Sequence, residues 1–420
     1  MAGAGAVLQL LAGALFAQSY GVYVVAFTAA FGWSKTILST GYALAQLEGG
    51  LLAPLQGWLL DRFGPRRVVA LGVLVFGAGL FWLSTVTSVA SFYGAMLVTG
   101  FGVVFAGYLS VTVAIVPWFV RWRSKALALT ALGLSLGGLA VPLIAGSVET
   151  FGPRTTLAAS AVVMVLFGMP AALFMRRDPA RYGQLADGVG PPRTTADAPG
   201  PRAPGPRAAV GQRPYEFTLR SALRTRAFWM LSIGHGSALL VVSAVVVHLI
   251  AHLAEDRGYP LAQAASVMAA LTATTIAGQF AGGVLGDRYE KRIVALVAML
   301  AHGAALLVLA WGPGLGSVGI FVVLHGLAWG VRGPLMGAMR ADYFGGRHFG
   351  AIMGASVLIV MLGQLAGPII AGSLADVLGA YRWGFTVLAF MAVLASVSFW
   401  FATPPRTPDA LGGGHGRART

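Results

Sequence analysis

Long apolar runs are the feature that most constrains the fold of this chain. An α-helix needs about 20 predominantly apolar residues to cross the ~30 Å hydrocarbon layer of a membrane, and the sequence has many runs of that length. A strand of a membrane barrel would show only about ten alternating residues, and these runs do not alternate. We therefore predict an all-α membrane protein. Its spans are expected at 5–31, 37–60, 68–87, 91–119, 126–148, 155–175, 227–252, 261–285, 293–311, 316–339, 349–375 and 382–402.

Composition supports this class and excludes others. Only 10% of the 420 residues are charged, against about 25% in soluble domains. The net charge of +15 would suggest nucleic acid as a partner of a soluble protein, but here the basic residues lie in short loops and one linker, as membrane topology requires. Nucleic acid is therefore not an expected partner. Because cysteine is absent, disulfides and cysteine-ligated metal sites are excluded. No charged leader precedes residues 5–31, so this run is interpreted as an uncleaved span.

The basic residues also predict the orientation. Cytoplasmic loops carry an excess of Lys and Arg. With the N-terminus inside, the short inner loops hold eleven basic residues and the outer loops hold four, so both termini are expected in the cytoplasm. The inner set is Arg62, Arg66, Arg67, Arg121, Arg123, Lys125, Arg288, Lys291, Arg292, Arg340 and Arg347, and the outer set is Lys35, Arg154, Arg257 and Arg382.

Two motifs recur at one offset, which indicates a duplication. The charged turn Gly57–Arg67 recurs in weaker form at Gly283–Arg292, where 283 − 57 = 226, and Pro142–Val148 recurs at Pro368–Leu374, where 368 − 142 = 226. Parallel halves of this kind place a central site between them in secondary transporters. We expect six-helix bundles at 1–175 and 226–403, a solvated Pro/Gly-rich linker at 176–225 and a tail at 404–420. Residues 220–224 are predicted to form a short interfacial helix.

These features resemble a known family. Twelve spans, a long loop after the sixth, and Gly-x-x-x-Asp-Arg-x-Gly-x-Arg-Arg at 57–67 resemble the major facilitator superfamily, over essentially the whole chain. Residues 31–36, 118–138 and 343–354 resemble its bacterial branch near monocarboxylate transporters and oxalate/formate antiporters, which implies the plasma (inner) membrane of a bacterium as the location. The resemblance implies two pseudo-symmetric six-helix bundles, alternating access, a monomer, and a central cavity lined by spans one, four, seven and ten. Span one has no charged residue and span eight no arginine, so the anion-binding device of the best-known relatives is missing.

Two charged residues are expected near the middle of the membrane, where charges are costly and usually functional. Arg332 in span ten is the candidate substrate anchor, because a guanidinium suits a carboxylate; alternatively it snorkels or satisfies backbone carbonyls in its own half. Glu48 in span two is the candidate proton-coupling group, because burial favours its neutral form and a nearby arginine its ionised form. Alternatively, a neutral Glu48 bonds to a neighbouring glycine-rich helix.

Several uncharged residues complete the predicted site. His325, Trp329 and Arg332 are spaced i, i+4, i+7 and so share one helix face. Amides and hydroxyls can fix a small polar ligand in an apolar pocket, although each of these groups could instead bond to a neighbouring helix. His235 is a candidate for proton coupling because histidine titrates near neutral pH, with simple packing as the alternative. The remaining substrate-site candidates are Gln18, Tyr20, Tyr23, Tyr108 and Gln364.

By resemblance, the charged turn implies a gate on the cytoplasmic side. Asp61 would face the N-terminus of span eleven, where the helix dipole is positive, and Arg121 would join it. The second copy lacks the glycine that corresponds to Gly64, since Glu290 stands there. The predicted gating residues are Gly57, Asp61, Arg62, Gly64, Arg66, Arg121, Asp287 and Arg288.

The sequence therefore predicts a secondary active transporter and no enzyme, cofactor or metal site. No phosphate-binding loop for ATP and no catalytic motif is present. We expect the substrate to be a small organic anion, a monocarboxylate, moved by proton symport or exchange. The alternatives are a proton-driven exporter of drug-like or hydrophobic compounds and a non-transporting membrane receptor.

Overall fold

The computed structural model describes residues 1–119, 123–176, 179, 182–185, 217–345 and 349–405. The first half is built only from helices within these ranges. Its helices are α1 (Ala2–Ala12), the π-helical turn η1 (Gly13–Ala17), α2 (Tyr20–Phe31), α3 (Lys35–Leu51), α4 (Ala53–Phe63), α5 (Pro65–Ser84), α6 (Val89–Ala106), α7 (Tyr108–Ile115), α8 (Arg123–Gly137), the 3-10 turn η2 (Gly138–Ala140) and α9 (Val141–Leu173).

The second half repeats the pattern with longer, less interrupted helices. The predicted short helix before the seventh span is present one residue earlier than expected, as α10. The helices are α10 (Leu219–Leu223), α11 (Arg226–Ala251), the π-helical turn η5 (His252–Asp256), α12 (Leu261–Arg288), α13 (Lys291–Trp311), α14 (Gly314–Phe344), α15 (Phe349–Leu378) and α16 (Tyr381–Phe401).

Ten helical segments in the described ranges are long and apolar enough to cross a membrane. The other two predicted spans are also present: one is joined to its neighbour in a single segment, and the other is interrupted. The segment Leu129–Leu173 holds two of the predicted spans, because Gly152 inside α9 adopts a φ of 79° and ψ of 162° that favours glycine. The second span is broken at Leu52 into α3 and α4. The predicted twelve-helix fold is thus confirmed.

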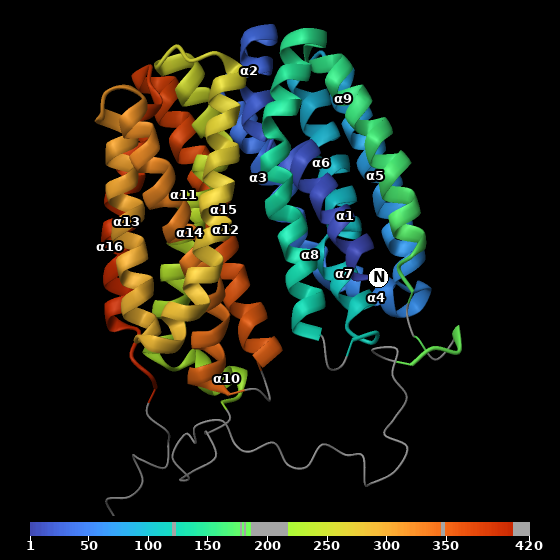
Figure 1. Cartoon of the computed structure of the whole chain (residues 1–420), viewed down its shortest axis with the longest axis vertical. Helices are drawn as coiled ribbons and strands as arrows, with labels where there is room; N and C mark the ends of the chain where they lie inside the picture. The colour runs from blue at the N-terminus through green and yellow to red at the C-terminus, as the bar shows by residue number, and fades with distance from the viewer. Residues whose placement is uncertain (120–122, 177–178, 180–181, 186–216, 346–348, 406–420) are drawn as a thin grey trace, which may run out of the picture.

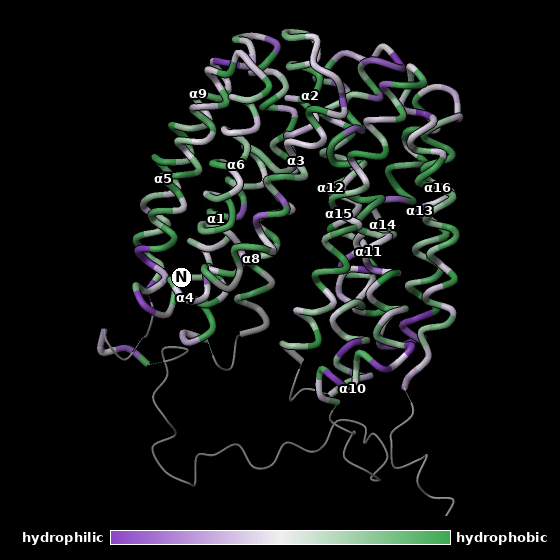
Figure 2. The backbone as a smooth tube through the Cα atoms, turned by 180° about the vertical axis from the view of Figure 1, so that it is seen from behind, coloured by the Kyte–Doolittle hydropathy of each residue, from purple (hydrophilic) through white to green (hydrophobic). Residues whose placement is uncertain are grey.

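The helices form two bundles that lie side by side (Figure 1). Hydrophobic residues cover the middle of the helices, and hydrophilic residues collect mostly toward the two ends (Figure 2). We call the end that carries Ala2, α10 and Phe401 the terminus side, and the opposite end the far side. This distribution of polarity is the one that a bilayer imposes on helices that span it.

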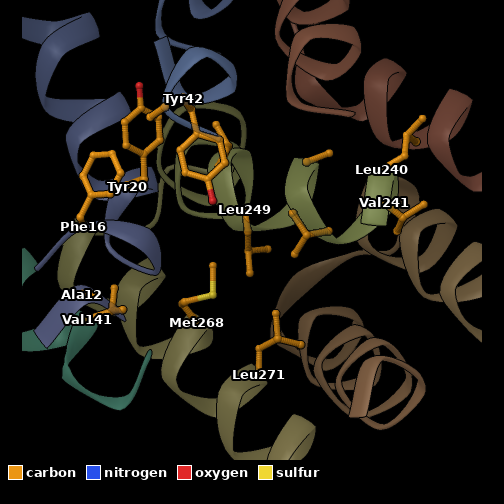
Figure 3. Packing of buried hydrophobic residues seen from close by; sticks show 14 of the residues in the cluster. Ala12, Phe16, Tyr20, Tyr42, Val141, Leu240, Val241, Leu249, Met268 and Leu271 are labelled. Atoms are coloured by element: carbon orange, nitrogen blue, oxygen red, sulfur yellow. The ribbon is translucent and has the colours of Figure 1, made fainter. Parts of the chain in front are cut away.

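Three helix pairs make most of the contacts between the bundles in the described residues. Helices α2, α3 and α9 of the first half pack against α11, α15 and α12 of the second. The ribbons meet at the far side and diverge toward the terminus side in both views (Figures 1 and 2). One hydrophobic cluster contains residues of both halves, among them Val141 and Met268 (Figure 3). The structure is therefore closed at the far side.

One predicted position is wrong. Arg340 was expected in a loop, but it lies inside α14 and its side chain is only 1% exposed. The predicted span ended at residue 339, and the helix continues for another turn, to Phe344.

Candidate functional site

Broken helices shape the centre of the molecule. The first span changes from α1 to the π-helical turn η1 at Gly13 and resumes as α2 at Tyr20, and π-turns of this kind are frequent at functional sites. The fourth span is broken at Gly107, between α6 and α7. Gln56 of α4 donates to the Val104 carbonyl oxygen (2.7 Å) and to the Ser110 hydroxyl (2.8 Å) across this break. Both breaks place polar side chains beside the central space.

A cavity of about 330 Å³ lies between the two halves. Its lining comes from the first, second, fourth and fifth spans of one half and from α11, α14 and α15 of the other. The polar and aromatic side chains on it are Gln9, Gln18, Tyr42, Gln46, Tyr108, Ser243, Trp329 and Gln364, and no residue on it is charged among those that the structure describes.

Four predicted substrate-site residues line this cavity together: Gln18, Tyr108, Trp329 and Gln364. The Gln18 Oε1 atom is buried without a hydrogen-bond partner among the described residues. A buried amide oxygen without a partner costs free energy, which a ligand that donates a hydrogen bond would recover. The grouping therefore has the character of a binding site for a polar molecule.

Four lining residues were not predicted: Gln9, Tyr42, Gln46 and Ser243. Gln9 Nε2 is also buried without a partner, so an unpaired donor and an unpaired acceptor border the same space. Tyr42 and Gln46 are four residues apart and share one face of α3. This spacing of polar residues in an apolar span is the sequence signal that could have identified Tyr42 and Gln46.

Two predicted tyrosines do not reach the cavity lining. Tyr20 is 2% exposed and donates to the Leu38 carbonyl oxygen at 2.6 Å. Tyr23 is equally buried and donates to the Leu15 carbonyl oxygen at 3.4 Å. Figure 3 shows the Tyr20 ring beside Phe16 and Tyr42; its centroid lies 4.8 Å from that of Tyr42. Both tyrosines therefore pack within the first half.

Arg332 lies one helical turn beyond Trp329 in α14. Its side chain is 1% exposed, and its Nε and Nη1 atoms have no hydrogen-bond partner among the described residues. An arginine buried without partners is strongly unfavourable. Arg332 is thus a cation beside the cavity but not on its lining.

His325 is fully buried behind Trp329, with the two ring centroids 6.4 Å apart. Its Nδ1 atom lies 3.0 Å from Nδ1 of His302 in α13. One ring must donate and the other accept. The Nε2 atoms of both rings lack partners among the described residues. His325 therefore packs inside the second half and not on the cavity.

His235 of α11 faces Arg340. Its Nδ1 atom lies 3.4 Å from an Nη atom of Arg340, which also donates to the Ser356 hydroxyl at 2.6 Å. Arg340 Nε donates to the same hydroxyl at 3.1 Å, and Nη1 donates to the Met336 carbonyl oxygen at 2.9 Å. Arg340, which the sequence analysis missed, therefore has partners on α14 and α15, and its Nη2 lies beside α11.

Glu48 is partly buried in α3. Its carboxyl lies against Gly100 of α6, and its Oε2 atom has no partner among the described residues. No ion pair between Glu48 and Arg332 occurs in the described part of the chain. The carboxyl therefore stays within the first half in this conformation.

The predicted gate residues that the structure describes lie at the terminus side. Gly64 ends α4 with a φ of 81°, and Arg62 is exposed, 6.0 Å from the Trp58 ring. Arg121 and the side chain of Asp61 lie outside the described residues. Gly57 is in α4 and Arg66 is exposed in α5, while Asp287 and Arg288 are exposed at the end of α12.

The sequence matches a family model across its length. The model is that of the Major Facilitator Superfamily, and it matches residues 6–331 and 231–419. The chain belongs to this superfamily. It is therefore a multi-pass membrane transporter of a family of non-enzymatic carriers.

Curated relatives cover most of this superfamily member. Monocarboxylate transporter 13 of Bos taurus is 25% identical, over 94% of this chain and 88% of the relative. The oxalate:formate antiporter of Oxalobacter formigenes is 24% identical, over 89% of this chain and 83% of the relative. The agnestins efflux protein AgnL12 of Paecilomyces divaricatus is 25% identical, over 76% of this chain and 67% of the relative.

Solved transporters have the same fold. A bacterial homologue of the human lysosomal transporter Spinster, in an inward-facing and unoccupied conformation, superposes with a TM-score of 0.71 at 16% identity, over 95% of this chain and 96% of that chain. The predicted resemblance to the superfamily is confirmed.

Proposed function

We propose that this protein is a secondary active transporter that moves a small organic anion, a monocarboxylate, through the central cavity by alternating access. The observation that supports an anionic substrate is Arg332, a buried guanidinium one turn from the cavity residue Trp329. Its Nε and Nη1 atoms have no partner in the described part of the chain. A carboxylate that reached it would supply two charge-assisted hydrogen bonds. Relatives named as monocarboxylate and oxalate:formate carriers support this substrate class.

The path from the cavity to Arg332 requires one movement. Trp329 lines the cavity and stands one turn before the arginine, so a change of its rotamer would expose the guanidinium. Gln18, Tyr108 and Gln364 would then hold the remainder of a small ligand by neutral hydrogen bonds.

We assign proton coupling to Glu48, with His235 as the second candidate. Glu48 and Arg332 lie in different bundles. Closure of the halves around an anion would bring the two side chains close enough for the charge of each to affect the other. The Glu48 Oε2 atom has no partner among the described residues, and a partly buried carboxyl can carry a proton across a membrane because its neutral form is compatible with burial.

The terminus side is proposed to face the cytoplasm, in agreement with the basic residues near it. The gate at Gly57, Asp61, Arg62, Gly64 and Arg66, with its repeat at Asp287 and Arg288, would then close when the far side opens. In Asp61→Asn, cysteines placed on the terminus side should become more accessible, because the negative partner of the helix dipole is lost.

Export of a hydrophobic or drug-like compound is the second candidate. It is favoured by the uncharged lining of the cavity and by the relative named as an agnestins efflux protein. A non-transporting receptor would bind ligand without flux.

Counterflow in proteoliposomes separates the three candidates. Purified protein would be loaded with unlabelled monocarboxylates, dicarboxylates or a cationic dye and supplied with labelled compound outside. Counterflow of a monocarboxylate that Arg332→Gln abolishes supports the proposal. Counterflow of the dye alone supports export, and binding without counterflow supports the receptor.

A further inference from the structure

A carboxylate of the second half covers the start of a helix in the first. Asp376, near the end of α15, accepts from the backbone N–H of Lys35 at 2.9 Å and of Thr36 at 2.8 Å. It also accepts from the Thr36 hydroxyl at 2.6 Å. Lys35 and Thr36 are the first residues of α3, whose N–H groups have no partner inside the helix. The capping residue Ser34 accepts from Ile37 N, at 3.2 Å.

The same arrangement occurs at the matching place in the repeat. Glu149 of α9, in the first half, accepts from the backbone N–H of Ala262 at 3.0 Å. Ala262 is the second residue of α12, in the second half. It corresponds to Thr36, since 262 − 36 = 226, and Asp376 corresponds to Glu149 within one residue, since 376 − 149 = 227. Each half therefore places an acid on a helix N-terminus of the other half.

Both contacts combine a negative charge with the positive end of a helix dipole. This is a stronger arrangement than an exposed ion pair, because the hydrogen bonds are charge-assisted and directional. It also depends on both halves: separation of the bundles at the far side breaks both contacts together.

Neighbouring contacts add to the Asp376 side. The Lys35 ammonium pairs with Glu255 at 2.9 Å and lies 4.5 Å from the centre of the Tyr381 ring. The Ser39 hydroxyl lies 2.9 Å from Nε2 of His248 in α11. These contacts also join the halves, so the α3–α15 edge is held by a cluster and the α9–α12 edge by the Glu149 contact.

We propose that Asp376 and Glu149 are gating residues that hold the far side of this transporter shut, each by capping a helix of the opposite half. They lie at the opposite end of the molecule from the charged turn at 57–67. The two caps must be released together for the far side to open, and either one biases the resting population toward the conformation described here. The inference rests on the proposed alternating access but not on any substrate.

The cysteine-free sequence gives a direct test. Ile250 is fully buried where α11 packs against Gly21 of α2, so an Ile250→Cys reporter should react with a membrane-impermeant maleimide only when the far side opens. The labelling rate would be measured in proteoliposomes, without substrate, in Asp376→Asn, Glu149→Gln and the double variant.

The matched control is Asp256→Asn. Asp256 lies on the same side, and its carboxylate bonds to His252 at 2.9 Å and to Tyr381 N at 2.7 Å, both in its own half. The substitution removes the same charge but no contact between the halves.

Each single gate variant should raise the labelling rate roughly tenfold, the effect of losing a charge-assisted hydrogen bond, and the double variant should raise it further. The control should label at the rate of the reporter alone. Unchanged labelling in both single variants, or an equal rise in Asp256→Asn, would overturn the proposal. Glu149→Gln removes only the charge from one exposed contact, so it tests the idea even if Asp376→Asn fails to fold. Because no substrate is used, this result is separate from the outcome of the counterflow experiment.

Discussion

Arg340 donates two hydrogen bonds to the hydroxyl of Ser356, from Nε at 3.1 Å and from Nη2 at 2.6 Å. Eight residues earlier on the same helix, Arg332 is equally buried, but two of its nitrogen atoms have no hydrogen-bond partner among the residues that the structure describes. The two arginines share chemistry, helix and burial and differ in whether the protein supplies partners. Arg340 therefore has the character of a structural residue, and Arg332 that of a group available to bind a ligand.

Arg332→Gln should abolish carboxylate counterflow while it leaves the protein folded. The substitution removes an uncompensated buried charge, so thermal stability should be unchanged or higher. Uptake in proteoliposomes and the melting temperature in detergent check both parts.

The paired control, Arg340→Gln, should have the opposite profile. It removes hydrogen bonds of a charged donor, which cost about 1.5–3 kcal/mol each when lost, so the melting temperature should fall while residual counterflow persists. If Arg332→Gln lowered stability and spared transport, the assignment of its role would be wrong.

Gln18→Ala should raise KM by about two- to tenfold, the range for losing one neutral hydrogen bond. The matched control is Tyr20→Phe, which removes only the bond to the Leu38 carbonyl oxygen. This control should lower thermal stability and leave KM unchanged. A larger effect on KM from Tyr20→Phe than from Gln18→Ala would contradict the assignment of the cavity.

The sequence predicted the fold, and four of the eight residues that it proposes for the substrate site line the central cavity. The other four do not line it, for a physical reason. Hydropathy gives the spans directly, because every lipid-exposed residue must be apolar. It does not give the rotation of each helix about its axis. Tyr20 and Tyr23 follow the π-helical turn η1. This turn has about one residue more than an α-helical turn, so the side chains that follow it are rotated about the helix axis. A regular 3.6-residue period therefore cannot tell which of these side chains meets the cavity.

Arg340 shows a second limit of sequence reasoning. A charged residue at the end of an apolar run is normally assigned to the loop, yet its true position depends on partners from other helices. Its partner Ser356 belongs to another helix, α15. The hydropathy of the residues around Arg340 does not reveal the contact between the two side chains. The caps at Asp376 and Glu149 have the same origin, since each needs a helix start from the other half.

Glu48→Gln should uncouple transport from the proton gradient. The neutral amide keeps the shape of the side chain but cannot exchange a proton, so accumulation driven by an imposed pH gradient should be lost while counterflow continues. Glu290→Gln is the control, because this exposed carboxylate pairs only locally with Arg292. A Glu48→Gln variant that still responded fully to the gradient would leave His235 as the candidate.

Gly367→Ala should destabilise the second half. A Cβ atom at this position would meet the Leu240 carbonyl oxygen of α11, so α15 and α11 would have to separate, at a cost of about 1–3 kcal/mol. Gly354 of the same helix is a matched control, because a Cβ there meets nothing within 4 Å and alanine is the better helix former by roughly 0.5–1 kcal/mol. Gly354→Ala should therefore match or exceed the parent in melting temperature. If both variants melted at the parent's temperature, the close approach of the two helices would not contribute to stability.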